Sequence, residues 1–356
     1  PIMYAYISQK ISLGKDRQIT AINWEPENDI ISVGFNTGGI KLLKFEEAGE
    51  KDGESQLAIN TNLAASHQKE IRTLSWNPHY EKLLSVDVHG KLVVWAENLG
   101  TYEEEMINES PRKPIKFASW SKNGTFIVIV IEGGNVILGS VEGDRIWEIN
   151  LTIDATHAAF FENDHTVVLS NNKGEIVAVD SPNGEIFAEY DLSEDNEKAK
   201  MKKTKTAEDV APEAGKDAAS DQIVCFESNN LEGVHSRLLI ALNNGSLYLV
   251  KNLRDGDMNK IELNIARIYG GCWSKSGKMF AISLMVENMQ SVFLFDNNAK
   301  LLQNFNTVKP CSLVDFNYNA TKLLATQQSF IFLSKIRPRH EFVHLRDKQV
   351  FAIKLE

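Results

Sequence analysis

The chain has 356 residues, of which 43% are hydrophobic and 24% charged, and its formal net charge is −10. This composition is that of an ordinary globular protein, and the acidic balance argues against the basic surface that nucleic-acid-binding proteins use. No apolar run approaches the roughly 18 residues of a membrane span, so no transmembrane segment is expected.

Residues 1–10 lack a basic region followed by an apolar core, so a signal peptide is not expected. Cys225, Cys272 and Cys311 each lie in an apolar, strand-like stretch. Three scattered cysteines favour a reducing compartment over a disulfide framework.

One phrase recurs along the chain: an apolar strand ending in an aromatic residue, a short polar turn, and a second apolar strand. After a strand-like stretch at 3–8, the first strands of seven copies are expected at 19–24, 71–76, 115–120, 157–161, 222–226, 268–273 and 311–316. The closing aromatic residues are Trp24, Trp76, Trp120, Phe161, Phe226, Trp273 and Phe316. Four-stranded propeller blades run about 40–45 residues each, which fits this spacing. The sequence therefore predicts an all-β, seven-bladed β-propeller.

Each copy continues with a turn and a third strand. Glycine marks the turn in five copies, at 37–39, 89–90, 133–134, 173–174 and 244–245, while 288–290 and 327–328 serve the last two. Glycine and asparagine permit the positive φ angles that two-residue hairpins need. Trp95 alone stands where a Trp-Asp signature would end the third strand, and Ala96 replaces the aspartate. The copies are therefore interpreted as divergent WD repeats.

The aromatic residue that ends each inner strand is expected to fill the wedge between neighbouring blades. These seven side chains are therefore predicted to be structural blade anchors. Truncating one to alanine should cost roughly 3–5 kcal/mol. Trp76→Ala, for example, is expected to lower the thermal stability without removing a specific binding contact.

The predicted domain covers residues 1–340. Its blades are expected near 19–66, 71–110, 115–152, 157–191, 222–264, 267–306 and 311–337. Because the seventh copy lacks an outer strand, residues 3–8 are expected to supply it and close the ring, with Gln349–Lys354 as the competing candidate.

Two further segments lie outside the repeats. Residues 192–221 contain no aromatic residue and are rich in Glu, Lys, Ala and Asp, so they are predicted to be a disordered insertion. Its lysines between 198 and 205 are interpreted as a solvated charged loop, with an acidic lipid surface or partner as the alternative. Residues 341–356 are expected to be a junction toward a following domain.

One known catalytic pattern occurs in the sequence. His340-Glu341-Phe342-Val343-His344 matches the H-E-x-x-H zinc motif, which works only on a helix that places both imidazoles on one face. Pro338 precedes it and no helical stretch extends it, so no zinc site is expected. Phosphate-loop, G-x-S-x-G and G-x-G-x-x-G patterns are absent from the sequence. No catalytic residue, cofactor or metal is assigned, and the chain is predicted not to be an enzyme.

Several phrases go beyond a generic propeller. They are Tyr6–Ile11, Leu42–Glu46, Glu104–Asn108, Gly139–Trp147 and Ile336–Pro338. With these phrases the chain resembles the N-terminal propeller of the WD-repeat core subunits of intraflagellar transport complex A. The resemblance covers nearly the whole chain except 192–221, and Gly139–Trp147 is its most specific part.

The resemblance implies a non-catalytic scaffold that assembles with other complex A subunits, supports retrograde transport and admits membrane proteins to the cilium. It implies location at the cilium or flagellum, the basal body and the cytoplasm, and cargo adaptors for membrane proteins as further partners. The alternative is a coatomer-like or tubby-like WD-repeat adaptor outside this complex. Arg145 and Trp147 are the candidate partner-binding residues, although a structural role is favoured for Trp147.

Overall fold

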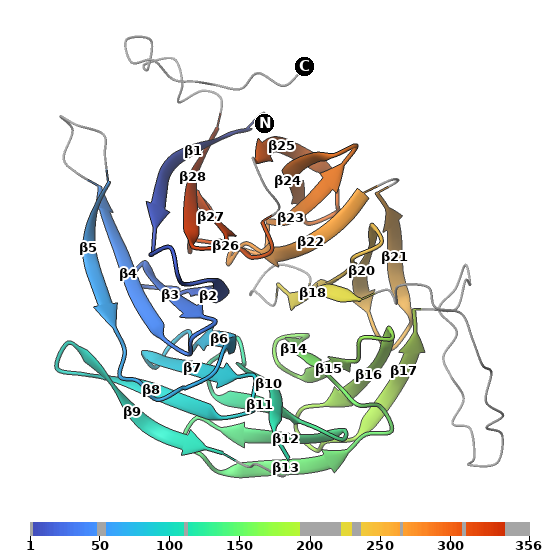
Figure 1. The fold of residues 1–356 in the computed structure, drawn as a ribbon. Helices are drawn as coiled ribbons and strands as arrows, with labels where there is room; N and C mark the ends of the chain where they lie inside the picture. Colours follow the sequence, from blue (N-terminus) through green and yellow to red (C-terminus); the bar gives the residue numbers. More distant parts are fainter. Residues whose placement is uncertain are drawn as a thin grey trace.

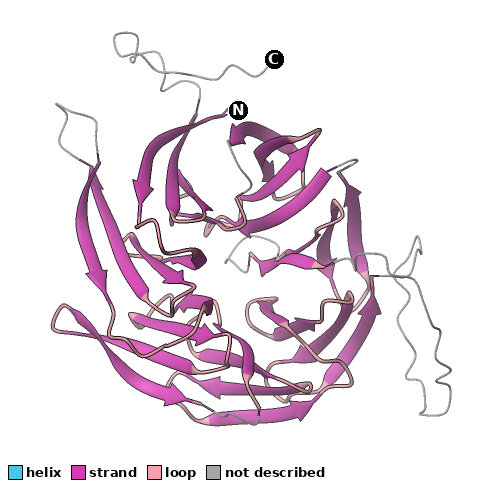
Figure 2. Cartoon of the chain, viewed as in Figure 1, coloured by secondary structure: helices cyan, strands magenta, loops and turns pink. Residues whose placement is uncertain are grey.

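The computed structural model describes residues 3–47, 55–109, 113–192, 222–229, 236–263, 266–307 and 311–338. Within these ranges the regular elements are β-strands, and they form seven four-stranded antiparallel sheets. The sheets stand side by side around a central opening (Figure 1). Figure 2 shows that strands and loops make up the described part of the ring. The predicted seven-bladed β-propeller is therefore confirmed.

The seven blades take their strands in chain order, with one exception. Blade 1 comprises β2 (Ile19–Trp24), β3 (Ile30–Phe35), β4 (Ile40–Glu47) and β5 (Ser55–Asn62). Blade 2 comprises β6 (Ile71–Trp76), β7 (Lys82–Asp87), β8 (Leu92–Asn98) and β9 (Thr101–Asn108). Blade 3 comprises β10 (Ile115–Trp120), β11 (Phe126–Ile131), β12 (Asn135–Ser140) and β13 (Arg145–Asn150). Blade 4 comprises β14 (His157–Phe161), β15 (Thr166–Ser170), β16 (Glu175–Asp180) and β17 (Ile186–Asp191).

The second half of the ring follows the same plan. Blade 5 comprises β18 (Ile223–Ser228), β19 (Leu238–Leu242), β20 (Ser246–Asn252) and β21 (Asp257–Glu262). Blade 6 comprises β22 (Ala266–Trp273), β23 (Met279–Val286), β24 (Met289–Asp296) and β25 (Leu301–Thr307). Blade 7 comprises β26 (Val314–Phe316), β27 (Lys322–Gln327), β28 (Phe330–Pro338) and, as its outer strand, β1 (Met3–Ser12).

Burial is highest in the second strand of a blade and falls toward the rim. All residues of β3 and β15, which are second strands, are buried, because these strands have a neighbouring blade on each face. Such strands read as continuous apolar runs. The outer strand β9 is exposed at most positions and carries three consecutive glutamates, Glu103 to Glu105. Charged residues on an outer strand discourage edge-to-edge pairing with another sheet.

The core is divided among the blade junctions. Seven clusters of buried apolar side chains are described, and each combines residues from two neighbouring blades. The cluster between blades 7 and 1 packs Trp24 and Val33 against Leu324 and Leu333. Apolar burial, the main favourable contribution to folding, therefore continues across the point where the ring closes.

The closing blade confirms the expected N-terminal strand. β1 pairs antiparallel with β28, from Met3 opposite Pro338 to Ser12 opposite Phe330. The strand is longer than the predicted 3–8, and its register shifts once, between Ile7 and Gln9. Gln349–Lys354, the competing candidate, lies outside the described residues.

Some turns take left-handed backbone angles without glycine. Glu287 and Asn288 in blade 6 have φ of 48° and 67°, and Gln328 in blade 7 has φ of 52°. At Gly90, glycine is required for space as well, because an added Cβ would lie 2.3 Å from the Ile115 nitrogen of the next blade. The turn at Gly90 therefore lies directly against the connection that leads into the next blade.

Three sequence predictions fall outside the described ranges. They are the insertion apart from Leu192, the H-E-x-x-H stretch and the junction at 341–356. In the part of the chain that the structure describes, no helix has the length and apolarity needed to cross a membrane.

Candidate functional site

The two faces of the ring carry different loops. We name the strands of each blade A to D from the axis outward. Because neighbouring strands are antiparallel, the turns A–B and C–D lie on one face, here called the A–B face. The B–C turns and the blade-to-blade connections lie on the opposite face, the D–A face.

Most of the predicted anchors end strand A and pack against the preceding blade. The five at this position are Trp24, Trp76, Trp120, Trp273 and Phe316, each at most 6% exposed. Each belongs to the apolar cluster that its blade shares with the preceding one. These five side chains therefore lie in the wedge between their own blade and the preceding one.

Blades 4 and 5 depart from that pattern. In blade 4, Phe160 packs into the cluster shared with blade 3, whereas Phe161 faces blade 5. The structure therefore moves the anchor position of blade 4 to Phe160. In blade 5, Phe226 is only partly buried because β18 continues to Ser228, which holds the final position. The Ser228 hydroxyl donates a hydrogen bond to the Phe160 carbonyl and so joins blades 4 and 5 without an aromatic ring.

Hydrogen bonds near the axis link the blades in sequence. In three blades, the residue before the last position of strand A accepts the backbone N–H of the next blade's anchor. Asp315 Oδ2 accepts from Trp24 N at 2.8 Å. Glu227 Oε2 accepts from Trp273 N at 2.8 Å. Asn23 Oδ1 of blade 1 likewise accepts from Trp76 N of blade 2 at 2.8 Å. These side chains satisfy buried backbone donors, which would be costly to leave unpaired.

Opposite charges face one another around these bonds. Lys275 Nζ lies 3.7 Å from Asp315 Oδ1. Burial raises the pKa of Glu227, although the charges of Lys122 and Lys275 act to lower it. Burial acts to lower the pKa of Lys275, but the charges of Asp315 and Glu227 outweigh it and raise the pKa overall. The charges of Lys122 and Lys275 thus balance those of the Glu227 and Asp315 carboxylates. Both carboxylates also accept the hydrogen bonds that join neighbouring blades.

Blade 2 contains a buried network that sequence reasoning missed. His67, in the connection before β6, places Nδ1 3.0 Å from Asp87 Oδ2 and Nε2 2.7 Å from Ser85 Oγ. Trp95 Nε1 donates to Ser85 Oγ at 2.9 Å. Burial lowers the pKa of His67 despite the neighbouring Asp87 carboxylate, so the imidazole is neutral near pH 7.

The Ser85–His67–Asp87 order matches that of a hydrolase triad, but its surroundings do not. The side chain of His67 is 0% exposed and that of Asp87 4%. The Ser85 oxygen already accepts the Trp95 indole N–H, and Ser85 is 0% exposed. A nucleophile must reach the reacting atom, so this network is structural.

The two predicted partner-binding residues lie on β13 with different exposures. The Arg145 side chain is 62% exposed and pairs with Glu148 on the same strand. Trp147 is 9% exposed, belongs to the cluster between blades 3 and 4, and donates from Nε1 to the Ser181 carbonyl at 2.6 Å. Arg145 is therefore the accessible member of the pair, whereas Trp147 joins two blades.

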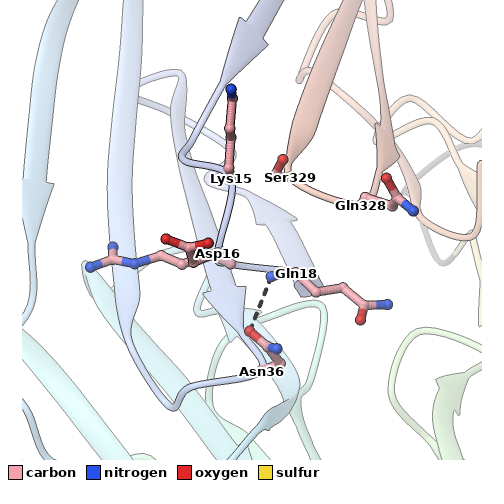
Figure 3. Close-up of a pocket in the computed structure, with 7 residues that line it drawn as sticks. Lys15, Asp16, Gln18, Asn36, Gln328 and Ser329 are labelled. Carbon is pink, nitrogen blue, oxygen red and sulfur yellow. Dashed lines mark hydrogen bonds between the residues drawn. The ribbon is translucent and has the colours of Figure 1, made fainter.

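An open depression lies on the D–A face where blades 7 and 1 meet (Figure 3). Its volume is about 350 Å³, and its lining is polar: Lys15, Asp16, Arg17, Gln18, Asn36, Gln328 and Ser329. Gln18 N donates to Asn36 Oδ1 at 3.0 Å, and the Arg17 guanidinium lies over the Phe35 ring. The charges of the lining are mixed, because Lys15 and Arg17 accompany Asp16.

A corner on the A–B face between blades 1 and 2 concentrates negative charge. We define the acidic corner as Glu25 and Glu27 of blade 1 with Glu81 and Glu97 of blade 2, around Tyr102. Glu25 is 4% exposed and accepts the backbone N–H groups of Glu27 and Asn28. The other three glutamates are exposed. Among the described residues, none of the four forms a salt bridge.

The described cysteines are buried, and the described His, Cys, Asp and Glu side chains do not gather in metal-binding groups of three. No group of three His, Cys, Asp or Glu side chains that could hold a metal ion occurs among the described residues. Cys225, Cys272 and Cys311 form no disulfide within the described part of the chain and are buried, and burial raises the pKa of each thiol. Thiols in such surroundings are poor nucleophiles.

Comparison with known proteins places these features in context. A family model described as WDR35/TULP4 N-terminal matches residues 3–337. WD repeat-containing protein 35 of Homo sapiens is 24% identical over 368 residues, which cover 98% of this chain and 29% of that protein. Its Rattus norvegicus counterpart is 25% identical over 372 residues, 98% of this chain and 30% of the relative. Tubby-related protein 4 of Homo sapiens is 23% identical over 313 residues, 81% of this chain and 20% of the relative. The chain thus spans less than a third of the length of these relatives.

Proposed function

This chain belongs to the family of WDR35/TULP4 N-terminal β-propellers, and we propose that it is a non-catalytic protein-interaction scaffold. The observation that carries the proposal is the extent of the match, from the closing strand β1 to the end of β28. Folds of this kind host many functions, so the fold alone does not identify the function and the side-chain clusters must be considered as well. The buried polar clusters near the axis and in blade 2 hold the blades together, and they leave no reacting group open to a substrate.

The more specific proposal is a role in intraflagellar transport complex A. The chain would act as the first propeller of a complex A subunit in retrograde ciliary transport and in the entry of membrane proteins into the cilium. Its partners would be other complex A subunits and cargo adaptors, and it would reside at the cilium, the basal body and the cytoplasm. Similarity to WD repeat-containing protein 35 over 98% of the chain supports this version.

The second candidate is a WD-repeat adaptor outside that complex, either tubby-like or coatomer-like. The similarity to Tubby-related protein 4 over 81% of the chain favours the tubby-like form. Both candidates use the propeller as a docking platform and differ in the proteins that they bind.

A pull-down separates the two. The tagged chain is incubated with extract from ciliated cells, and the bound proteins are identified by mass spectrometry. The first proposal expects complex A subunits, enriched over a pull-down with an unrelated seven-bladed propeller. Recovery of a different set of proteins, with no complex A subunit, would favour the adaptor. A hydrolase screen with measurable turnover that is lost in an Asp87→Asn variant would overturn the non-catalytic role.

A further inference from the structure

We propose that the acidic corner between blades 1 and 2 binds an arginine side chain presented by a partner protein. The inference rests on the scaffold role proposed above and adds a location and a chemical class of partner. It is carried by the strand register and by two features of the described residues: carboxylates without a counter-ion, and a buried indole N–H without an acceptor.

The register places the acidic groups of blade 2 in one row. Lys82 pairs with Ala96, and Glu97 pairs with Tyr102. Glu81, one residue before Lys82, therefore lies at the same level as Glu97 and Tyr102. Tyr102 packs on the cluster shared with blade 1, so this row faces blade 1, where Glu25 lies.

The corner has a strongly negative potential. Burial, followed by the charges of Glu25, Glu81 and Glu97, raises the pKa of Tyr102 to about 12. Burial also raises the pKa of Glu25, and Glu27 and Glu81 add to the shift. The nearby Lys82 is already engaged, because its Nζ lies 2.6 Å from Glu105 Oε2. A cation from outside the described chain would therefore relieve repulsion that the fold leaves in place.

The second observation concerns the Trp76 indole. Trp76 is 4% exposed, and within the described part of the chain its Nε1 has no hydrogen-bond acceptor. In blade 1, Trp24 Nε1 donates to Asp29, the positive-φ residue that ends the A–B turn, at 2.7 Å. Glu81 holds the same place in blade 2, also at positive φ, yet the bond is missing.

The comparison with Trp24 directs the Trp76 N–H toward the acidic corner. Trp76 also packs edge-on with Tyr102, the residue at the centre of the corner, with ring centroids 5.4 Å apart. Trp120 Nε1 in blade 3 is similarly unpaired, but its turn carries no comparable cluster of acids. Only at Trp76 do the unpaired donor and the carboxylates coincide among the described blades.

Arginine fits these groups better than lysine does. Its planar guanidinium presents five N–H donors and can bind two carboxylates at once, for instance Glu81 and Glu97. It also stacks on aromatic rings, and Tyr102 borders the corner. The peptide that carries the arginine has backbone carbonyl groups, which are the acceptor type that the Trp76 N–H lacks.

The test uses two fluorescent peptides at 150 mM salt. One is a blocked Gly-Ser-Arg-Gly-Ser-Arg-Gly-Ser peptide, and the other has citrulline, a neutral isostere, in place of both arginines. We expect the 356-residue chain to bind the arginine peptide at least about tenfold more tightly than the citrulline peptide. Equal affinity for the two peptides would overturn the proposal.

Variants locate the site. Glu27→Lys with Glu81→Lys should weaken binding of the arginine peptide by about tenfold or more. Glu70→Lys, an exposed reversal on the opposite face of blade 2, is the matched control and should change it by less than about twofold. Equal weakening by the double variant and the control would refute the location. Unchanged melting temperatures establish that each variant is folded.

The same variants separate this inference from the proposed function. If the double variant still recovers the full set of complex A subunits, the scaffold role stands and the acidic corner is not its docking site. If the unaltered chain recovers no complex A subunit but binds the arginine peptide at the acidic corner, the inference stands and the complex A assignment fails.

Discussion

The hydrogen-bond network of blade 2 leads to a quantitative prediction for Ser85→Ala. With His67 neutral, Nδ1–H donates to Asp87, so Nε2 must accept the Ser85 O–H. The Ser85 oxygen in turn accepts the Trp95 N–H. Removing one hydroxyl therefore leaves both a buried acceptor and a buried donor unpaired.

Each unpaired buried group costs about 1–3 kcal/mol, so the two groups left by Ser85→Ala should together lose roughly 2–6 kcal/mol of unfolding free energy. With an unfolding entropy of roughly 2.1 cal/mol/K per residue over 356 residues, a loss of this size lowers the melting temperature by about 3–8 °C. Circular dichroism during heating and urea titration measure the two quantities.

Ser32→Ala provides the matched control. Ser32 is also 0% exposed, but its hydroxyl makes a single hydrogen bond, to the Asn23 carbonyl at 3.0 Å. Its loss should cost only about 1 kcal/mol. If Ser85→Ala destabilises the chain no more than Ser32→Ala does, the proposed network contributes nothing and the reasoning fails.

Three further predictions test other parts of the fold. Burial lowers the pKa of His157 to about 4, so the unfolded state binds more protons below pH 6.5, and stability should fall by up to roughly 3 kcal/mol between pH 6.5 and 4. Urea titrations across this range should show a shallower decline in unfolding free energy for His157→Gln than for the unaltered chain. An equal decline would contradict the lowered pKa of His157. Gly90→Ala should cost about 2–4 kcal/mol, because the added Cβ meets the next blade, whereas Gly100→Ala, with open space around it, should cost only about 1 kcal/mol in the same assay. Asp315→Ala should lose about 2 kcal/mol by leaving Trp24 N–H unpaired, while Asp315→Asn retains an acceptor; thermal melts that rank the two equally would argue against this linkage.

The repeat pattern was sufficient to predict the architecture. Apolar strands, polar turns and closing aromatic residues recur because each blade must bury both faces of its inner strands. Blade 4 shows where this reasoning loses precision. Phe160 and Phe161 are adjacent aromatic residues that face opposite neighbours, and the sequence alone gives no reason to prefer either.

The candidate sites were harder to predict, because their residues come together only across blades. His67 lies in a connection 18 to 20 residues before Ser85 and Asp87, and the substitution of Ala96 for aspartate obscured the usual signature of the repeat. A histidine before strand A combined with Trp95 is the signal that could have indicated the network. The acidic corner joins Glu25 to glutamates more than 50 residues away, and only the register brings them together.

The pairing of β1 with β28 has a consequence for biosynthesis. The first strand leaves the ribosome early, but its partner lies 318 or more residues further along the chain, as the pair Ser12–Phe330 shows. At a translation rate of about 5–20 residues per second, this delay amounts to roughly 16–64 s. During that time the nascent strand lacks its hydrogen-bonded strand partner, so a chaperone that shields its edge would protect the growing polypeptide until blade 7 is complete.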